Sequence, residues 1–539
     1  MINGNDLWPE KYTSDMITLN YTKQYAVTTY PNLPHNLYEA LVASSKKHPK
    51  KIAIIDDYNR EYSYSKLLKM VDHFSSYLYY ISNIQFGNHV GVMLYNSIEF
   101  CISFLAINKL GAIAVPLPSK FKENEVLSLV EKSNLQHIIC DENFYNWFVP
   151  LETKEIRIIK STNGQNGYGF SHLSASYLSP SASIGNPSDP AIIMFTSGTT
   201  SQSKGALIKN YNIMHAIVSY QRILNITSQD ISIIPIPIYH ITGLVALLGL
   251  FLYSGATLYL HKFFDAKRVL TYVKEKGITF IHASPTVFSL LLQESSNFPK
   301  LPKLTQFACG SSNMPVEILK KVHQWLPHLS FHTVYGLTET TSPATIFPGN
   351  ACTSNYIGSS GLPIPGTQFQ ILDDDGNDVP NGCVGEIAIK GTIVLTQYYH
   401  SVTDSLSEDG WLKTGDLGYF NSDNYLFIVD RKKDMINRGG EKIWSFDVEN
   451  ELYKIPDIVE AAVVGIPDDI YGEAVGAVVK VLSGSTLTIT DIQLCLKNRI
   501  AKYKIPTQLL ILEEIPLTTN SKIDKSKIKL LFQTQKEVC

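Results

Sequence analysis

A hydroxyl-rich loop that follows an apolar run is the stretch with the clearest chemical capacity. Residues 192–195 are apolar, and residues 196–205 then read Thr-Ser-Gly-Thr-Thr-Ser-Gln-Ser-Lys-Gly. Gly198 and Gly205 allow close approach of the backbone, while hydroxyls, backbone N–H groups and Lys204 can donate hydrogen bonds to phosphate oxygens. We therefore predict that a buried strand leads into a phosphate-binding loop.

Two other kinds of loop have to be weighed against this prediction. The P-loop of nucleotide hydrolases has a glycine directly before its lysine and Ser or Thr directly after it. Ser203 and Gly205 occupy those positions here, which excludes a P-loop. An ordinary polar loop after a strand remains the alternative when this stretch is considered alone.

Two later clusters carry groups that suit a nucleotide. The sequence Tyr-Gly-Leu-Thr-Glu at 335–339 follows the apolar run 330–334. Tyr335 can lie against a flat base, and Glu339 can hold a divalent metal. Asp416, in a Thr-Gly-Asp-Leu-Gly turn, can accept hydrogen bonds from the two ribose hydroxyls. A plain strand end and a plain Asp-Gly turn are the alternatives.

Two basic stretches lie near the end of the chain. Residues 430–434 read Asp-Arg-Lys-Lys-Asp, where Arg431 suits a ribose or phosphate contact and Lys433 is free to be a pivot. Lys522 follows a run of small polar residues, and its ammonium matches phosphate and carboxylate oxygens together. Each stretch, considered alone, also fits an ordinary solvated segment.

The composition narrows the class of protein. With 539 residues, the chain is long enough for two or more domains. The 46 basic and 49 acidic residues nearly balance, so neither nucleic acid nor an anionic membrane is expected as the main partner. The seven cysteines include no CxxC pair, and residues 1–23 show no basic start followed by an apolar core, so we expect no signal peptide. We therefore expect no zinc site and no disulfide scaffold, and we predict a cytoplasmic location.

The uncharged segment 231–260 is long enough to span a membrane. Pro235, Pro237 and Gly243 interrupt it, however. We predict a strand, a loop, a buried helix and a second strand instead, and hence no integral membrane span.

The positions of the predicted elements indicate an α/β fold. Helical and strand patterns alternate from residue 36 to 140 and again from 268 to 309, which favours parallel strands covered by helices. Asn36 and Asn124 are predicted helix caps. Residues 163–190, rich in Ser, Gly, Asn and Pro, are predicted to be a connector. Turn-separated β segments are predicted after Gly361, and an α+β unit of about a hundred residues after Lys433.

The order and joint presence of these clusters resemble the adenylate-forming superfamily of acyl-coenzyme A synthetases, amino-acid adenylation domains and firefly luciferase. The resemblance extends from Tyr38 to Lys525. It implies a large multi-sheet α/β N-terminal domain (1–430) and a small mobile α+β lid (431–539) that rotates about Lys433. In the first half-reaction, ATP and a carboxylic acid would give an acyl-adenylate and pyrophosphate; in the second, a thiol would displace AMP.

The resemblance also implies roles for individual residues. The groups that would hold the β- and γ-phosphates are Thr196, Ser197, Gly198, Thr199, Thr200 and Lys204. Those that would form the adenine pocket are Gly310, Ser311, Ser312, Tyr335 and Gly336. Thr338 would touch the α-phosphate, Glu339 and Thr196 would bind Mg²⁺, and Asp416 and Arg431 would hold the ribose. Lys522 would bridge the acid and the α-phosphate, and His240 would lie beside the acyl pocket. Lys522, Glu339, Thr196 and His240 are therefore the predicted catalytic residues.

Several positions depart from the family pattern. Ser201, Ser203 and Ser521 stand where Gly, Pro and Gly are usual, Leu517 where Arg is common, and Ser445 where Pro is frequent. Only the change at Leu517 removes a charge. We therefore expect activity to be retained, with altered flexibility of the lid loop.

The same residues suggest the substrates. The stretches 241–244, 282–285 and 308–310 contain no acidic residue, so a substrate ammonium would be buried without a partner. No arginine is evident for a second carboxylate either. We therefore expect an apolar monocarboxylic acid, fatty or aromatic.

The expected thiol is coenzyme A, because no carrier domain follows Lys522, and its pantetheine would pass Gly439, Gly440 and Trp444. Two alternatives remain. One is a stand-alone enzyme that loads a separate carrier protein in natural-product biosynthesis. The other is a non-catalytic nucleotide-binding relative, against which Lys204, Glu339, Asp416 and Lys522 argue.

Overall fold

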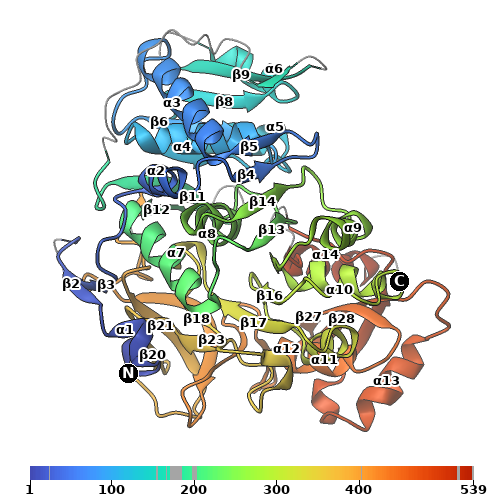
Figure 1. Cartoon of the computed structure of the whole chain (residues 1–539). Helices are drawn as coiled ribbons and strands as arrows, with labels where there is room; N and C mark the ends of the chain where they lie inside the picture. Colours follow the sequence, from blue (N-terminus) through green and yellow to red (C-terminus); the bar gives the residue numbers. More distant parts are fainter. Residues whose placement is uncertain are drawn as a thin grey trace.

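The computed structural model describes residues 1–22, 25–152, 156–164, 167–169, 185–196, 203–401, 403–518 and 522–536. It is an α/β protein with two large mixed sheets, an antiparallel sheet and a smaller C-terminal sheet, as the sequence predicts. Figure 1 shows the first large sheet and its helices at the top (blue to cyan) and the C-terminal unit at the lower right (orange to red).

The first large sheet has eight strands and delivers the chain to the predicted phosphate loop. Its strands, in spatial order, are β10 (Gly167–Gly169), β9 (Arg157–Gly164), β8 (His137–Asp141), β6 (His89–Met93), β7 (Ile113–Pro116), β11 (Pro190–Phe195), β12 (Gly205–Lys209) and β22 (Tyr398–Tyr399). The predicted strand 192–195 is confirmed as part of β11. Since β12 returns antiparallel to β11, the loop between them joins two neighbouring strands, whereas a P-loop leads into a helix.

The second large sheet has nine strands. They are, in order, β19 (Leu362–Pro363), β18 (Thr345–Ile346), β17 (Ser330–Tyr335), β16 (Gln306–Cys309), β15 (Phe280–Ala283), β13 (Ile231–Ile234), β14 (Thr257–Leu260), β4 (Ile52–Ile55) and β5 (Glu61–Ser63). Strands β17, β16, β15, β13, β14 and β4 are parallel. The loops that follow these strands therefore meet at one edge of the sheet, where ligands bind in open α/β folds.

Helices cover both large sheets. They are α2 (Leu37–Lys47), α3 (Tyr64–Tyr80), α4 (Ile98–Lys109), α5 (Glu123–Lys132), α7 (Asn210–Leu224), α9 (Ala266–Lys276), α10 (Pro285–Gln293) and α11 (Val316–Trp325), with the short α1 (Glu10–Thr13) and α6 (Tyr145–Phe148). The Asn36 side chain caps α2 by accepting a hydrogen bond from the Glu39 N–H, as predicted. The cap predicted at Asn124 is wrong. Helix α5 begins two residues earlier than predicted, at Glu123, and the Glu125 carboxylate accepts the Lys122 N–H instead.

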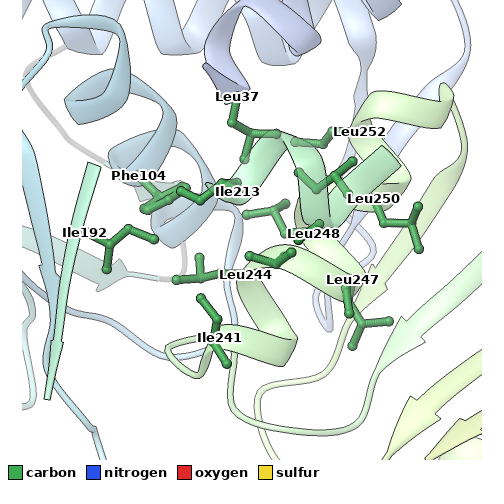
Figure 2. Close-up of a cluster of buried hydrophobic side chains, with 14 of the residues drawn as sticks. Leu37, Phe104, Ile192, Ile213, Ile241, Leu244, Leu247, Leu248, Leu250 and Leu252 are labelled. Atoms are coloured by element: carbon green, nitrogen blue, oxygen red, sulfur yellow. The ribbon is translucent and has the colours of Figure 1, made fainter. Parts of the chain in front are cut away.

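The uncharged segment 231–260 folds as predicted into strand, loop, helix and strand. Its helical part consists of a π-helix, η3 (Thr242–Gly249), followed by α8 (Leu250–Ser254). Leu244, Leu248 and Leu252 point into a cluster with Phe104 of α4 and Ile213 of α7, as Figure 2 shows. In the described part of the chain, no helix is both long and apolar enough to cross a bilayer.

The antiparallel sheet carries the residues that lead toward the C-terminal unit. Its order is β1 (Ile2–Asn3), β20 (Thr367–Leu372), β21 (Gly385–Gly391), β23 (Leu412–Phe420) and β24 (Leu426–Arg431). Both predicted turns lie between β20 and β21, with Gly376 at φ +87° and Gly382 at φ +89°. The predicted connector is partly wrong, because its first residues belong to the hairpin of β9 and β10. Its residues 170–184 lie outside the described part.

The C-terminal unit is α+β, as predicted. It contains β25 (Ile436–Arg438), β26 (Glu441–Ile443), α12 (Ser445–Tyr453), β27 (Ile458–Asp468), β28 (Gly472–Val481), α13 (Ile489–Lys497), β29 (Gln508–Ile511) and α14 (Lys525–Lys536). Helix α12 packs against β27 and also contacts β24 and α11, so this unit lies directly on the rest of the protein. The boundary between residues 430 and 431 stays a prediction.

Candidate functional site

One cavity of about 1090 Å³ brings together distant parts of the chain. Loops from both large sheets, strands β23 and β24 and the C-terminal unit all contribute to its wall. The predicted site residues on this wall are Thr196, His240, Gly310, Ser311, Gly336, Thr338, Glu339, Asp416, Arg431, Lys433 and Lys522. The structure therefore places the C-terminal lysine in the same cavity as the end of β11.

Six predicted residues in the described part of the chain lie off this wall: Lys204, Ser312, Tyr335, Gly439, Gly440 and Trp444. Lys204 donates a 2.9 Å hydrogen bond to Thr403 Oγ1, and its carbonyl accepts the Thr196 N–H at 3.0 Å. Gly439 and Gly440 form the turn between β25 and β26, and Trp444 precedes α12. Ser197, Gly198, Thr199 and Thr200 lie outside the described residues, as do Ser201 and Ser521.

Asp416 is the centre of a buried polar network. In the register of β23 and β24 it faces Arg431, whose Nε lies 3.1 Å from Asp416 Oδ1. The Tyr335 hydroxyl donates to Asp416 Oδ2 at 2.9 Å. Burial and the Asp416 charge raise the pKa of Tyr335, so its hydroxyl stays a neutral donor. Each carboxylate oxygen has two lone pairs, which leaves Asp416 able to accept hydrogen bonds from a diol as well.

Glu339 is a half-buried carboxylate in the short 3₁₀-helix η5 (Thr338–Thr340) after β17. Its carbonyl accepts the Leu395 N–H at 2.9 Å, which fixes its backbone. Burial raises the pKa of Glu339, while a 3.2 Å hydrogen bond from the Tyr398 hydroxyl to Oε1 opposes that rise. No cluster of three or more acidic, His or Cys side chains suited to a metal occurs among the described residues. A single carboxylate fits Mg²⁺, which is commonly held by one or two carboxylates together with substrate phosphates.

Replacing Tyr398 with phenylalanine should weaken Mg²⁺ binding. Loss of its hydroxyl removes a donor to Glu339 and lets the pKa of this carboxyl rise further. Loss of a residue that orients a metal ligand typically lowers metal affinity 10- to 100-fold, so we expect the Mg²⁺ concentration for half-maximal activity to rise about tenfold. Titration of Mg²⁺ at saturating ATP checks this. Tyr399→Phe on the same strand is the control, and an equal effect of both substitutions would contradict the role of Tyr398.

His240 lies in the loop after β13, where the backbone approaches itself closely. A Cβ on Gly243 would lie 2.8 Å from the Pro237 carbonyl oxygen, so this turn requires glycine. Burial, together with the nearby charges of Lys522 and Lys120, lowers the pKa of His240 to about 3. Its buried Nε2 has no hydrogen-bond partner among the described residues. The imidazole is therefore neutral and available to a ligand.

Lys522 reaches the cavity from a closed loop. Thr518 and Lys522 pair through a 2.6 Å hydrogen bond from the Thr518 N–H to the Lys522 carbonyl and a 3.2 Å bond from the Lys522 N–H to Thr518 Oγ1. Burial and the Arg431 charge lower the pKa of Lys522 to about 8, while Asp416 and Glu339 oppose that change. The Lys522 ammonium is therefore close enough to interact electrostatically with Arg431, Asp416 and Glu339.

Sequence reasoning missed several residues of the cavity wall. They are Tyr95, Lys120, Lys262, Phe263 and Tyr398. The Lys262 ammonium lies 4.3 Å from the centre of the Tyr95 ring, and Phe263 is 64% exposed beside it. A lysine followed by two phenylalanines at the end of β14 was the only available signal, and it is a weak one. Tyr398 gives no local signal at all.

This convergence agrees with comparisons to known proteins. The sequence model of the AMP-binding enzyme family matches residues 41–399, and that of the AMP-binding enzyme C-terminal domain matches residues 447–522. The chain belongs to the AMP-binding enzyme family. These matches confirm the predicted adenylate-forming superfamily and the predicted class of enzyme, an acid–thiol ligase.

Individual relatives of this AMP-binding enzyme are similar over most of their length. It is 29% identical to an indoleacetate–CoA ligase of Aromatoleum aromaticum, covering 88% of this chain and 93% of that one. It is 28% identical to a medium-chain fatty-acid–CoA ligase of Escherichia coli, covering 92% and 90%. O-succinylbenzoate coenzyme A synthetase of Bacillus subtilis, solved with ATP and magnesium ion, superposes with a TM-score of 0.80 at 27% identity, covering 91% of this chain and 99% of that one.

Proposed function

We propose that this AMP-binding enzyme joins a carboxylic acid to coenzyme A through an acyl-adenylate. The observation that carries the proposal is the convergence of Lys522, Arg431, Asp416 and Glu339 on one cavity. Its relatives named above are acid–CoA ligases, which supports the same general reaction here.

The predicted site residues, on the cavity wall or next to it, have complementary roles in the first half-reaction. Asp416 and Arg431 hold the ribose, and Gly310, Ser311, Ser312, Tyr335 and Gly336 form the adenine pocket. Thr196 and Lys204 bind the β- and γ-phosphates with the residues between them, and Thr338 contacts the α-phosphate. Glu339 and Thr196 would hold Mg²⁺, which would supply positive charge against the phosphates.

The chemistry explains why a cationic side chain is needed at this place. When a carboxylate oxygen attacks the α-phosphorus, one anion approaches another, and pyrophosphate leaves as acyl-AMP forms. Lys522 bridges the two anions and stabilises the charge that develops at the α-phosphorus. In the second half-reaction, the thiol sulfur attacks the acyl carbon and AMP leaves.

The wall of the cavity favours an uncharged acyl group. Apolar side chains on it include Ile236, Ile241, Val287, Leu290, Val334 and Leu337. Its carboxylates all have another partner or role: Glu386 accepts from Lys432 and the Gly415 N–H, and we assign Asp416 to the ribose and Glu339 to Mg²⁺. None of them is left to pair with a substrate ammonium. We therefore propose an apolar monocarboxylic acid, fatty or aromatic, beside the neutral His240.

Coenzyme A is the thiol that the cavity wall suits best. Lys120 and Lys262 offer positive charge, and Tyr95 and the exposed Phe263 offer flat faces, which together match the phosphates and adenine of a nucleotide. Gly439, Gly440 and Trp444 lie off the cavity in this lid orientation. They would approach it only after the lid, residues 431–539, rotates about Lys433.

Product analysis tests the whole proposal. Purified protein with ATP and Mg²⁺ should release AMP with some members of a panel of fatty, aryl and amino acids, and mass analysis should find the thioester with coenzyme A alone. If a thioester forms only with a phosphopantetheinylated carrier protein, the thiol acceptor is that carrier protein and not coenzyme A. Absence of acid-dependent pyrophosphate exchange across the panel would favour a nucleotide-binding protein without catalysis, and release of ADP would indicate a phosphotransferase.

The low pKa of Lys522 predicts the pH dependence of adenylation. A lysine whose pKa is lowered to about 8 is an ammonium below that pH and loses its charge above it. We expect kcat/KM for ATP, which reports on the free enzyme, to fall about tenfold per pH unit above about pH 8. Pyrophosphate release measured across this range checks it. In Lys522→Arg the guanidinium stays charged, so the fall should disappear; a fall of the same size in that variant would assign it to another group.

A further inference from the structure

A second polar cluster, buried away from the cavity, connects the C-terminal unit to β24. The Asp430 carboxylate accepts the Ser445 N–H at Oδ2 (2.5 Å) and the Ser445 hydroxyl at Oδ1 (3.0 Å). The Lys525 ammonium donates to Ser445 Oγ at 2.6 Å and pairs with Glu449 at 3.0 Å. Asp430 and Ser445 are both completely buried. None of these four side chains lines the cavity.

The place of these residues in the chain makes the cluster sensitive to lid orientation. Asp430 lies on β24, before the proposed pivot Lys433, whereas Ser445 begins α12 and Lys525 begins α14. A rotation about the pivot would therefore separate Asp430 from the Ser445 N–H and hydroxyl and move it away from the Lys525 charge. Lys525 lies close to Lys522 in the sequence. The contact between Lys525 and Ser445 therefore fixes the start of α14 and, with it, the position from which Lys522 reaches the cavity.

We propose that Asp430, Ser445 and Lys525 form a latch that holds the lid in the adenylating orientation and so positions Lys522. They act through Lys522 and are positioning residues, since they do not touch the substrate. The inference rests on the proposed function. Breaking the latch removes both Ser445 donors and leaves the buried Asp430 carboxylate with the Arg431 N–H alone. This is unfavourable unless water replaces them, so the latch biases the two lid orientations toward the first half-reaction.

Ser445 makes this latch a property of this chain. The family pattern that the sequence resembles frequently has proline at this position, and proline has neither an N–H group nor a hydroxyl. Both hydrogen bonds to Asp430 would then be missing. Ser445 is the first residue of α12, a position at which proline fits the helix geometry well. Ser445→Pro therefore removes the latch and is expected to leave the helix intact.

The two half-reactions, measured separately, test the latch. In Ser445→Pro, single-turnover formation of acyl-AMP should fall about tenfold, while thioester formation from supplied acyl-AMP should stay unchanged or become faster. Ser445→Ala, which keeps the N–H, should lie between this variant and the native protein. Ser445→Thr, which keeps both donors, should restore adenylation.

Matched controls separate the latch from a general loss of structure. Ile489→Pro places proline at the first position of α13, in the same lid but away from the latch, and should leave the ratio of the two half-reactions unchanged. Equal losses in both half-reactions of Ser445→Pro, or no loss in either, would overturn the latch. A native protein that forms no acyl-AMP with any acid would instead overturn the proposed function.

Discussion

Replacing Lys522 with alanine should slow acyl-adenylate formation by about 10²–10³-fold and leave thioester formation from supplied acyl-adenylate largely intact. The magnitude follows from the loss of one positioned donor at a site of developing charge. The asymmetry follows from the lid: its Lys522 face borders the cavity in the orientation described here, and a rotated lid presents another face. Rapid-quench measurement of each half-reaction checks both parts of the prediction.

Lys527 provides the matched control for this substitution. It lies on α14, is largely exposed, and pairs only loosely with Asp524 at 3.6 Å. Lys527→Ala should therefore change neither half-reaction. Equal losses of both half-reactions in Lys522→Ala would show that this lysine supports the structure of the lid and does not act on the α-phosphate.

Local signals in the sequence predict the elements of the fold well. Asn36 caps α2 because its side chain needs only a backbone N–H three residues away. Asn124 fails as a cap for an equally local reason, since the Glu125 carboxylate reaches back to the Lys122 N–H and the helix begins earlier. The uncharged stretch 231–260 was assigned correctly because proline and glycine interrupt it, and the structure shows that its charge-free side chains fill the core.

The site was predictable where a short motif carries the chemistry, and unpredictable where distant segments meet. Asp416 and Arg431 were both identified, but their pairing follows from the register of β23 and β24. The bond from Tyr398 to Glu339 joins β22 to η5, and no sequence pattern encodes it. Gly439, Gly440 and Trp444 lie off the cavity, and no local sequence signal shows on which side of the packed C-terminal unit they fall.

The departure at Ser445 shows how a local difference acquires meaning from its surroundings. In the sequence it is only a missing proline and suggests altered flexibility of the lid. In the structure its N–H and hydroxyl both bind Asp430, so the substitution adds two contacts across the proposed pivot. The structure gives that expectation a direction, a lid that is held more firmly in this orientation.

Replacing Asp416 with asparagine should lower kcat/KM for ATP by about 10²-fold. The carboxylate accepts hydrogen bonds from Tyr335 and Arg431, and a hydrogen bond to a charged group contributes about 1.5–3 kcal/mol. The NH₂ group of the asparagine would face the Tyr335 hydroxyl or the Arg431 guanidinium, which are themselves donors. Its remaining carbonyl oxygen would be a weaker acceptor for the ribose. Steady-state kinetics with varied ATP measure the loss, and Asp423→Asn, at the exposed turn between β23 and β24, is the control.

A nucleotide analogue shows whether that loss arises at the ribose. The native protein should use 2′-deoxy-ATP less efficiently than ATP, because one hydroxyl donor to Asp416 is missing. In Asp416→Asn the difference between the two nucleotides should shrink, since the shared interaction is already weakened, and the four rate constants form a thermodynamic cycle. If the two losses simply add, Asp416 does not contact the 2′-hydroxyl, and its effect on ATP use comes from holding Arg431 and Tyr335 in place.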